Sequence, residues 1–217
     1  MIRYKCLVRY VFALLFIFGS MAIQANVRCD DVEVLNLNPS FEEVPDFKDW
    51  TQYVNAAAAA FFDIDKEAIE GKQCAHIEVT QVSGTNWHVG LTQDGLTVEA
   101  GELYTVDFFA KADVKRIINL ELKRSPGQGD WEGIASQDIN ITEEWAEYFI
   151  NFTPVNDYEG TTFLGFWVAQ FKGEVWIDGA RLYEGKKQER EEIVPKPSVE
   201  SNGKLASTWA AIKWSDR

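Results

Sequence analysis

Residues 104–110 read Tyr-Thr-Val-Asp-Phe-Phe-Ala, and an apolar or aromatic side chain stands at every second position. This period of two places alternate side chains on the two faces of a β-strand. Similar runs occur at 118–122, 146–152 and 164–168. Turn-forming residues separate the runs, and no convincing long helix lies between them. The pattern predicts an all-β protein, an antiparallel β-sandwich that occupies residues 26–184.

The composition excludes two classes of protein. The chain has 217 residues, a formal net charge of −13 and 46% hydrophobic residues. This hydrophobic content can form a core and excludes disorder of the whole chain. An acidic chain repels phosphate backbones, so nucleic-acid binding is not expected. The 8 Trp residues of so acidic a chain still need a role.

Residues 1–25 are typical of a secretory signal peptide. Basic residues at Arg3, Lys5 and Arg9 precede the uncharged apolar run Tyr10–Phe18, and small residues follow it. The run is short for a membrane span, and no second long apolar run occurs, so no transmembrane segment is expected after cleavage. The protein is therefore expected outside the cell, or in the periplasm if it is bacterial.

Cleavage at that place leaves Cys29 and Cys74 as the cysteines of the mature chain. In an oxidising compartment two cysteines favour one disulfide, and two free buried thiols are the alternative. Neither cysteine has a His or a second Cys at zinc-binding spacing.

The composition changes after the predicted domain. Residues 26–184 hold 11 basic and 29 acidic side chains, a net charge of −18, whereas residues 185–217 hold 7 and 5, a net charge of +2. Residues 185–203 are predicted to be a flexible linker. In residues 204–217, three apolar side chains at helical spacing indicate either a short docking or sorting tag or a frayed tail.

The strand expected at 163–171 is apolar on both faces. Leu164, Phe166 and Val168 suffice for the core, yet Phe163 and Trp167 lie on the opposite face. If the strands at 103–111 and 117–123 share its sheet, the outer face mixes aromatic rings with hydrogen-bonding groups. Sugars have apolar C–H faces that stack on aromatic rings and hydroxyls that need polar partners. The face is therefore either a carbohydrate site or a surface that loops or the C-terminal segment cover.

Nine residues are candidates for carbohydrate binding. Three Trp residues would stack on sugar rings, one Phe would form a wall, and five polar residues would bond hydroxyls. The Trp of the Gly-rich loop after Arg124 has no strand context that would bury it. The candidates are Trp87, His88, Phe109, Asn119, Glu121, Lys123, Trp131, Trp167 and Gln170.

The chain shows no catalytic signature. It has no nucleophile elbow, no phosphate-binding Gly-rich loop and no His-rich metal spacing. His76 alternates with Cys74 and Glu78 and is expected to be structural. Glycosidases need only two carboxylates, so the many acidic residues carry no information about hydrolysis. No catalytic residue is predicted.

Five stretches resemble, in order, the motifs of one family. They are an N-x-x-F-E motif with a following Trp, a W-x-V-x-L-x-Q-x-G motif, an A-G-x-x-Y-x-V-x-F-x-A-K-A motif, an x-W-x-x-Y strand and a closing G-x-V-x-I-D motif. They lie at 38–50, 87–95, 100–112, 144–148 and 173–183. The chain resembles the carbohydrate-binding module superfamily of families 4, 9 and 22, and the resemblance covers about residues 32–184.

This resemblance implies a galactose-binding-like β-jelly roll that binds β-glucans, xylans or related chains and does not itself catalyse. Members are usually attached to glycoside hydrolases, and many hold a structural calcium ion. Glu42 and Asp178 match the calcium carboxylates of the family, although both could instead accept hydrogen bonds from nearby turns. Gly90 and Gly179 depart from the residues common at these positions in the family.

The sequence leaves three alternative functions open. The first is a secreted, monomeric, non-catalytic module that binds a neutral polysaccharide chain. The second is a structural or adhesive surface protein whose jelly roll meets a protein, with residues 204–217 docking to a partner. The third, the least supported, is a small glycoside hydrolase or an accessory to one.

Overall fold

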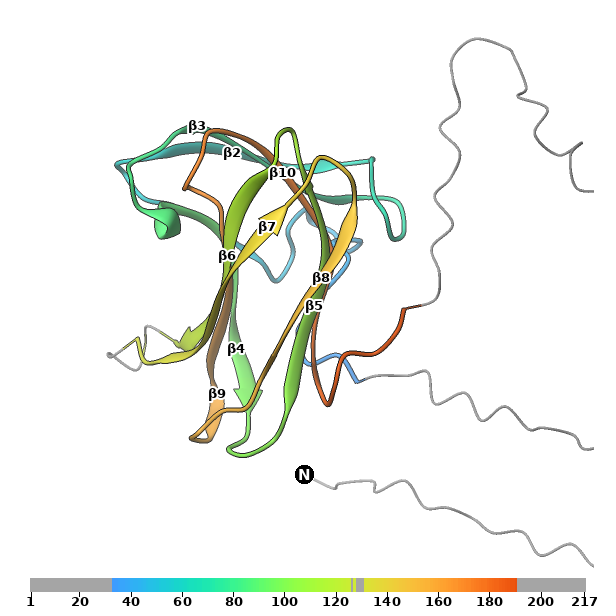
Figure 1. Cartoon of the computed structure of the whole chain (residues 1–217), viewed down its shortest axis with the longest axis vertical. Helices are drawn as coiled ribbons and strands as arrows, with labels where there is room; N and C mark the ends of the chain where they lie inside the picture. Colours follow the sequence, from blue (N-terminus) through green and yellow to red (C-terminus); the bar gives the residue numbers. More distant parts are fainter. Residues whose placement is uncertain (1–32, 126, 128–130, 191–217) are drawn as a thin grey trace, which may run out of the picture. The chain divides into compact units, whose positions relative to one another are not determined.

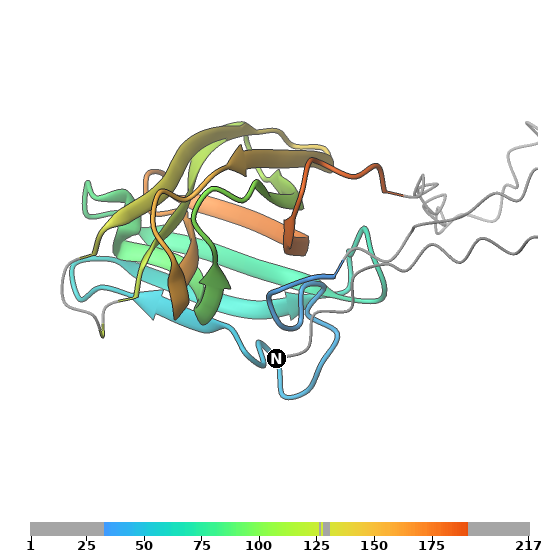
Figure 2. The ribbon, with the colours of Figure 1, turned by 90° about the horizontal axis from the view of Figure 1, so that it is seen from below.

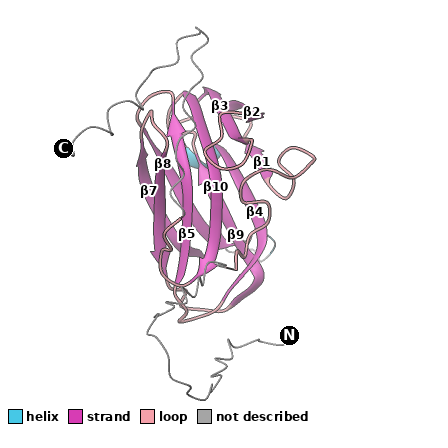
Figure 3. Ribbon diagram, turned by 90° about the vertical axis from the view of Figure 1, so that its right-hand side faces the viewer, coloured by secondary structure: helices cyan, strands magenta, loops and turns pink. Residues whose placement is uncertain are grey.

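The computed structural model describes residues 33–125, 127 and 131–190. The predicted signal peptide, Cys29 and residues 204–217 lie outside these ranges. Two five-stranded sheets pack face to face, and all the strand pairs are antiparallel. Figure 1 and Figure 2 show the two layers, and Figure 3 shows strands joined by loops, with one short helical turn in the described part. The prediction of an all-β antiparallel sandwich is confirmed.

The first sheet has the order β1-β4-β9-β6-β7. Its strands are β1 (Thr51–Val54), β4 (Val89–Val98), β9 (Tyr158–Trp167), β6 (Arg116–Arg124) and β7 (Gly133–Ile141). A single 3-10 turn, η1 (Asn86–His88), precedes β4.

The second sheet has the order β2-β3-β10-β5-β8. Its strands are β2 (Ala59–Asp65), β3 (Cys74–Gln81), β10 (Gly173–Glu184), β5 (Tyr104–Ala112) and β8 (Ala146–Phe152). The last two alanines of the run at 56–60 are the first two residues of β2.

The core forms where the inward-facing side chains of the two sheets meet. The alternating residues of β5 and β6 that the sequence assigned to the interior are all buried. The ring of Phe108 in β5 meets the ring of Phe166 in β9 edge to face, with centroids 4.9 Å apart. This contact joins the two sheets through the middle of the sandwich, and burial of such side chains contributes about 1.5–3 kcal/mol each.

The structure corrects the assumption that three strands share one sheet. β6 and β9 are neighbours in the first sheet, but β5 pairs with β10 and β8 in the second sheet. Phe109 of β5 therefore lies on the other side of the sandwich from Trp167 of β9.

Residues 185–190, the start of the predicted linker, are bound to the second sheet. The Gly185 amide donates to the carbonyl of Leu103 at 2.7 Å, and the Gln188 amide donates to the hydroxyl of Tyr183 at 3.0 Å. Arg190 forms an ion pair with Glu70 at 2.7 Å. The described domain thus continues beyond residue 184, and the rest of the predicted linker lies outside the described residues.

Cys74 is completely buried at the start of β3, and burial raises the pKa of its thiol. Because Cys29 lies outside the described residues, the disulfide between them stays a prediction. Within the residues that the structure describes, no helix has the length and apolarity that a membrane span needs.

Candidate carbohydrate-binding site

A cleft of about 590 Å³ opens on the outer face of the first sheet. Residues from β1, β4, β6 and β9 form its floor, and residues from the loops before β4 and before β7 extend it. We call it the aromatic cleft. Its lining residues are Thr51, Tyr53, Trp87, Thr92, Asp94, Glu121, Lys123, Trp131, Phe163 and Trp167.

The strand register explains why these side chains meet. Residues that face each other across neighbouring strands point to the same side of the sheet. One cross-sheet row joins Tyr53, Gly90, Trp167 and Asn119, and the next joins Thr51, Thr92, Gly165 and Glu121. Lys123 faces Phe163 in the row after that.

Two glycines leave the space in which the aromatic rings lie. A Cβ atom on Gly90 would stand 2.2 Å from Cε3 of Trp167, and a Cβ atom on Gly165 would stand 2.9 Å from Cε2 of Phe163. The rings therefore lie directly over glycine backbone, as close to the sheet as the chain allows. The departure of Gly90 from the family pattern has this physical reason.

Five aromatic rings form a continuous ribbon along the cleft. Ring centroids are separated by 6.3 Å from Trp87 to Tyr53, 5.9 Å from Tyr53 to Trp167, 5.8 Å from Trp167 to Phe163, and 6.1 Å from Phe163 to Trp131. The ends of the ribbon are open, because Trp87 is 44% exposed and Trp131 is 51% exposed. The middle is the buried floor, where Trp167 is 7% exposed.

Charged groups flank the rings. Glu121 Oε2 accepts a hydrogen bond from Trp167 Nε1 at 2.9 Å, and Glu121 Oε1 lies 2.9 Å from Lys123 Nζ. Asp94 Oδ1 accepts from the hydroxyl of Ser125 at 2.8 Å. The cleft thus combines apolar ring faces with hydrogen-bonding groups, as sugar recognition requires.

Five of the nine candidates from the sequence line the cleft, namely Trp87, Glu121, Lys123, Trp131 and Trp167. The other five lining residues were not among the candidates. Phe163 and its parity were recognised in the sequence, but Tyr53 and Thr51 lie on β1, whose four residues show no alternation long enough to predict a strand. Thr92 and Asp94 lie on β4, which the sequence had marked by a family motif alone.

Four candidates lie outside the cleft lining. His88 is the last residue of η1, and its Nδ1 lies 2.6 Å from the hydroxyl of Ser83. The amide of Asn119 donates to Asp138 at 2.8 Å, next to the cleft floor. Gln170 is exposed in the loop after β9.

Phe109 is the candidate that the structure moves furthest. It belongs to β5 in the second sheet, and the guanidinium of Arg190 lies over its ring at 4.5 Å from the centroid. The prediction that it forms a wall of the binding face was wrong in its placement, because alternation fixes the face of a strand and not the sheet to which the strand belongs.

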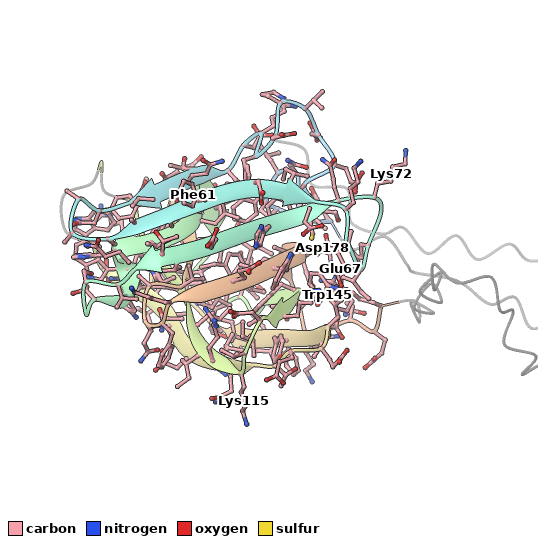
Figure 4. All side chains as sticks on the ribbon, turned by 90° about the horizontal axis from the view of Figure 1, so that it is seen from above. Phe61, Glu67, Lys72, Lys115, Trp145 and Asp178 are labelled. Carbon is pink, nitrogen blue, oxygen red and sulfur yellow. The ribbon has the colours of Figure 1, made fainter. Side chains whose placement is uncertain are left out.

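The outer face of the second sheet holds a second aromatic cluster, whose polar groups pair with one another. The ring of His76 stacks on Trp176 at 4.7 Å, and His76 Nδ1 lies 2.6 Å from Asp63. Lys111 Nζ lies 4.6 Å from the centroid of Trp176 and 2.7 Å from Glu67. Figure 4 shows Glu67, Asp178 and Trp145 near one end of this sheet. These contacts fix the position of the His76 ring, and its structural role stays a prediction.

A buried charge network lies beside this cluster. Asp107 accepts two hydrogen bonds from the Arg181 guanidinium, at 2.9 and 2.8 Å, and one from the Tyr183 hydroxyl at 2.7 Å. Burial alone would raise the pKa of Asp107, but Arg181, Arg190 and Tyr183 outweigh it and hold that pKa below its ordinary value. The same burial raises the pKa of Tyr183 to about 12.

The two predicted calcium ligands hold one loop at both of its ends. Asp178 Oδ2 accepts from the amides of Ile69 and Glu70 at 3.0 and 2.8 Å. Glu42 Oε1 accepts from the amides of Lys72 and Gln73 at 2.6 and 2.9 Å. These bonds correspond to the alternative role that the sequence allowed, as acceptors from nearby turns.

The fit of a calcium ion to these residues is mixed. In the part of the chain that is described, no group of three or more His, Cys, Asp or Glu side chains lies close enough to hold a metal ion. Asp178, however, is completely buried, and burial raises its pKa to about 7, although backbone amides at residues 70, 179 and 69 lower it in part. A cation beside this carboxylate would relieve that cost, so calcium stays a prediction.

Comparisons with known proteins point to one family. A family model described as "Carbohydrate binding domain" matches residues 35–164. No curated protein matches the chain significantly. Among solved structures, the chain is similar to one described as "CBM4 structure and function", with a TM-score of 0.58, 21% identity, and coverage of 70% of this chain and 99% of that chain.

Two further structures have the same fold. The second N-terminal cellulose-binding domain of β-1,4-glucanase C from Cellulomonas fimi has a TM-score of 0.55 and 18% identity, with coverage of 73% of this chain and 99% of that chain. The Stig cyclase Fisc from Fischerella sp. TAU has a TM-score of 0.53 and 17% identity, with coverage of 72% and 99%. At such identities these likenesses show the fold alone, and the fold serves both a binding domain and a cyclase.

Proposed function

Because the chain belongs to the CBM_4_9 family of carbohydrate binding domains, we propose that it binds a neutral polysaccharide chain, of the β-glucan or xylan type, in the aromatic cleft. The observation that carries this proposal is the ribbon of five rings between Trp87 and Trp131. A row of rings matches a row of sugar C–H faces, which single scattered aromatic residues would not do.

The charge of the domain supports a neutral ligand. Residues 26–184 carry a net charge of −18, and the cleft contributes two carboxylates, Asp94 and Glu121, against the one ammonium group of Lys123. A chain of uronic acids would meet repulsion in this field. The carboxylate of Asp94, the ammonium of Lys123 and the hydroxyl of Thr51 offer partners for sugar hydroxyls without requiring a charged sugar.

The proposed setting is outside the cell. It rests on the basic leader and apolar run of residues 1–25, which are typical of exported proteins. A structural calcium ion beside Glu42 and Asp178 is proposed with it, and its support is the buried carboxylate of Asp178. The ion would stabilise the loop at 69–73, on the second sheet, and takes no part in sugar binding.

Affinity electrophoresis in hydroxyethylcellulose, mixed-linkage β-glucan and xylan tests the proposed function. Trp167→Ala should abolish retention in the retarding gel, because it removes the ring that joins the two halves of the ribbon. Trp87→Ala and Trp131→Ala remove exposed rings, so each should fold normally and weaken binding about fivefold, given about 1 kcal/mol for each stacking contact. Phe61→Ala is the matched control, since this 68% exposed ring lies on the second sheet and its loss should leave retention unchanged.

Two results would contradict the proposed function. The first is equal retention of wild type, Trp87→Ala and Trp131→Ala, which would place binding elsewhere. The second is no retention of the wild type in any polysaccharide, which would favour the structural or adhesive alternative.

A further inference from the structure

Trp167 is held in one orientation by its neighbours in the aromatic cleft. Its six-membered ring lies over Gly90, and the neighbouring ring of Tyr53 meets it edge to face at an interplanar angle of 77°. The ring still has one polar atom, Nε1, and this atom donates to Glu121 Oε2 at 2.9 Å. The contact to Gly90 sets the depth of the indole, and the hydrogen bond sets the direction in which its plane points.

Both carboxylate oxygens of Glu121 are engaged within the protein. Oε2 accepts from Trp167, and Oε1 lies 2.9 Å from Lys123 Nζ. The Glu121 side chain is only 15% exposed, although it lines the cleft. A carboxylate in this position acts first on its protein partners and has little accessible surface left for a sugar hydroxyl.

We propose that Glu121 is a positioning residue for ligand binding, which acts through the indole of Trp167, and that Lys123 in turn fixes the carboxylate. This role replaces the direct sugar contact that the sequence suggested for Glu121. The three residues belong to adjacent strands β6 and β9, so the hydrogen bond also ties the cleft floor across a strand pair.

The physical reason is the mobility of an indole over glycine. Without Glu121, nothing but ring contacts would define the rotation of Trp167, because the backbone beneath it has no side chain. A hydrogen bond to a charged acceptor is worth roughly 1.5–3 kcal/mol and has a preferred direction. Holding the ring in its bound orientation before the ligand arrives lowers the entropy cost of binding.

The first test needs no ligand. In a ¹⁵N–¹H spectrum of the full chain, the Trp167 indole peak is identified by its loss in Trp167→Phe. Glu121→Ala should shift this peak to the position of an indole without a carboxylate acceptor and speed its hydrogen exchange at least tenfold. Glu121→Gln should keep the peak near its wild-type position, since the amide oxygen can still accept from Nε1.

The second test rests on the proposed function and measures binding to the polysaccharide that retains the wild type best. Glu121→Ala should raise Kd roughly tenfold, and Glu121→Gln should raise it less than about threefold. In the Trp167→Phe background, which has a ring but no N–H donor, Glu121→Ala should change Kd by less than about twofold. Glu159→Ala is the matched control, because Glu159 is an exposed carboxylate on β9 of the same sheet, outside the cleft lining, and its loss should leave Kd unchanged.

Each outcome decides between the two roles of Glu121. An equal loss of affinity from Glu121→Ala with and without the Trp167 N–H would show direct contact with the ligand and overturn the proposal. An unshifted Trp167 peak in Glu121→Ala would overturn it as well. If the wild type binds none of the polysaccharides, the proposed function fails, and the spectrum alone still decides whether Glu121 positions Trp167.

Discussion

At the scale of single residues, Asp178 has a more unusual environment than Glu42, the other carboxylate that matches the calcium ligands of the family. It is completely buried, its three backbone donors are neutral, and burial raises its pKa to about 7. A folded-state pKa above the unfolded value favours the protonated form in the folded protein. The contribution of protonated Asp178 to the free energy of unfolding is therefore complete below about pH 4. This contribution is lost as the pH rises to about 7.

The pH dependence of unfolding tests this environment. Between about pH 4 and pH 7, the free energy of unfolding of wild type relative to Asp178→Asn should fall by about 1 kcal/mol per pH unit, as measured by urea denaturation. A calcium ion at this site would favour the ionised carboxylate. Ca²⁺ should therefore reduce the fall in the free energy of unfolding and raise Tm at pH 7, whereas EDTA should reverse both effects. Parallel pH curves for the two proteins would contradict the raised pKa, and equal Tm values in Ca²⁺ and EDTA would contradict the calcium site.

Single residues also show what the sequence could predict about the site. The outward position of Trp167 and Phe163 followed from alternation, and the surface position of Trp131 followed from its Gly-rich loop. Tyr53 could not be found in this way, because its four-residue strand is too short for a pattern. The roles of residues that act through a neighbour, such as Glu121, depend on distances that no local pattern contains.

At the scale of elements, the cleft depends on the fit between β4 and β9. Their register places Gly90 opposite Trp167. A Cβ atom at residue 90 would stand 2.2 Å from the Trp167 ring and 2.6 Å from the carbonyl oxygen of Phe166. The floor of the cleft is therefore a pairing of a residue without a side chain and the largest side chain, which only the strand register brings together.

Gly90→Ala tests this pairing. The added methyl group should push Trp167 out of its place, lower the free energy of unfolding by about 1–3 kcal/mol and weaken polysaccharide binding at least fivefold. Thermal melting and affinity electrophoresis measure the two effects. Gly133→Ala on β7 is the control, because no heavy atom lies within 4 Å of a Cβ atom built there, and both properties should stay close to those of wild type. Wild-type affinity in Gly90→Ala would show that the depth of the Trp167 ring does not matter.

Elements also set the limit of prediction for the fold. Alternation identified the strands that became β5, β6, β8 and β9, since one buried face imposes a period of two on each. It could not assign β5 to the second sheet, because strand partners are chosen by contacts between residues far apart in the chain. The wrong placement of Phe109 came from this single step.

At the scale of the whole molecule, Arg190 connects the end of the described chain to the body of the second sheet. Its guanidinium meets Glu70, Asp107, the carbonyl of Gly179 and the ring of Phe109. The side chain is 5% exposed, so these charges are largely removed from water. Loss of one partner from a buried ion pair leaves the others uncompensated and typically costs about 3–5 kcal/mol.

Arg190→Ala should therefore lower Tm by several degrees or more in thermal denaturation. Lys186→Ala is the control, because Lys186 is exposed in the same segment and its loss should leave Tm nearly unchanged. Polysaccharide retention measured well below Tm should be the same in both variants and in wild type, since the aromatic cleft belongs to the other sheet. A Tm of Arg190→Ala equal to that of wild type would show that residues 185–190 contribute nothing to the stability of the domain.

The place of Arg190 also determines how the domain would carry mechanical load. A polymer held in the cleft would pull on the first sheet, whereas a tether attached after residue 190 would pull on the second. Tension would then cross the core between the sheets and reach the Arg190 ion pairs before it reached strand β10. The ion pairs of Arg190 with Glu70 and Asp107 would break first. Residues 185–190 would then separate from the second sheet while the polymer stayed bound in the cleft.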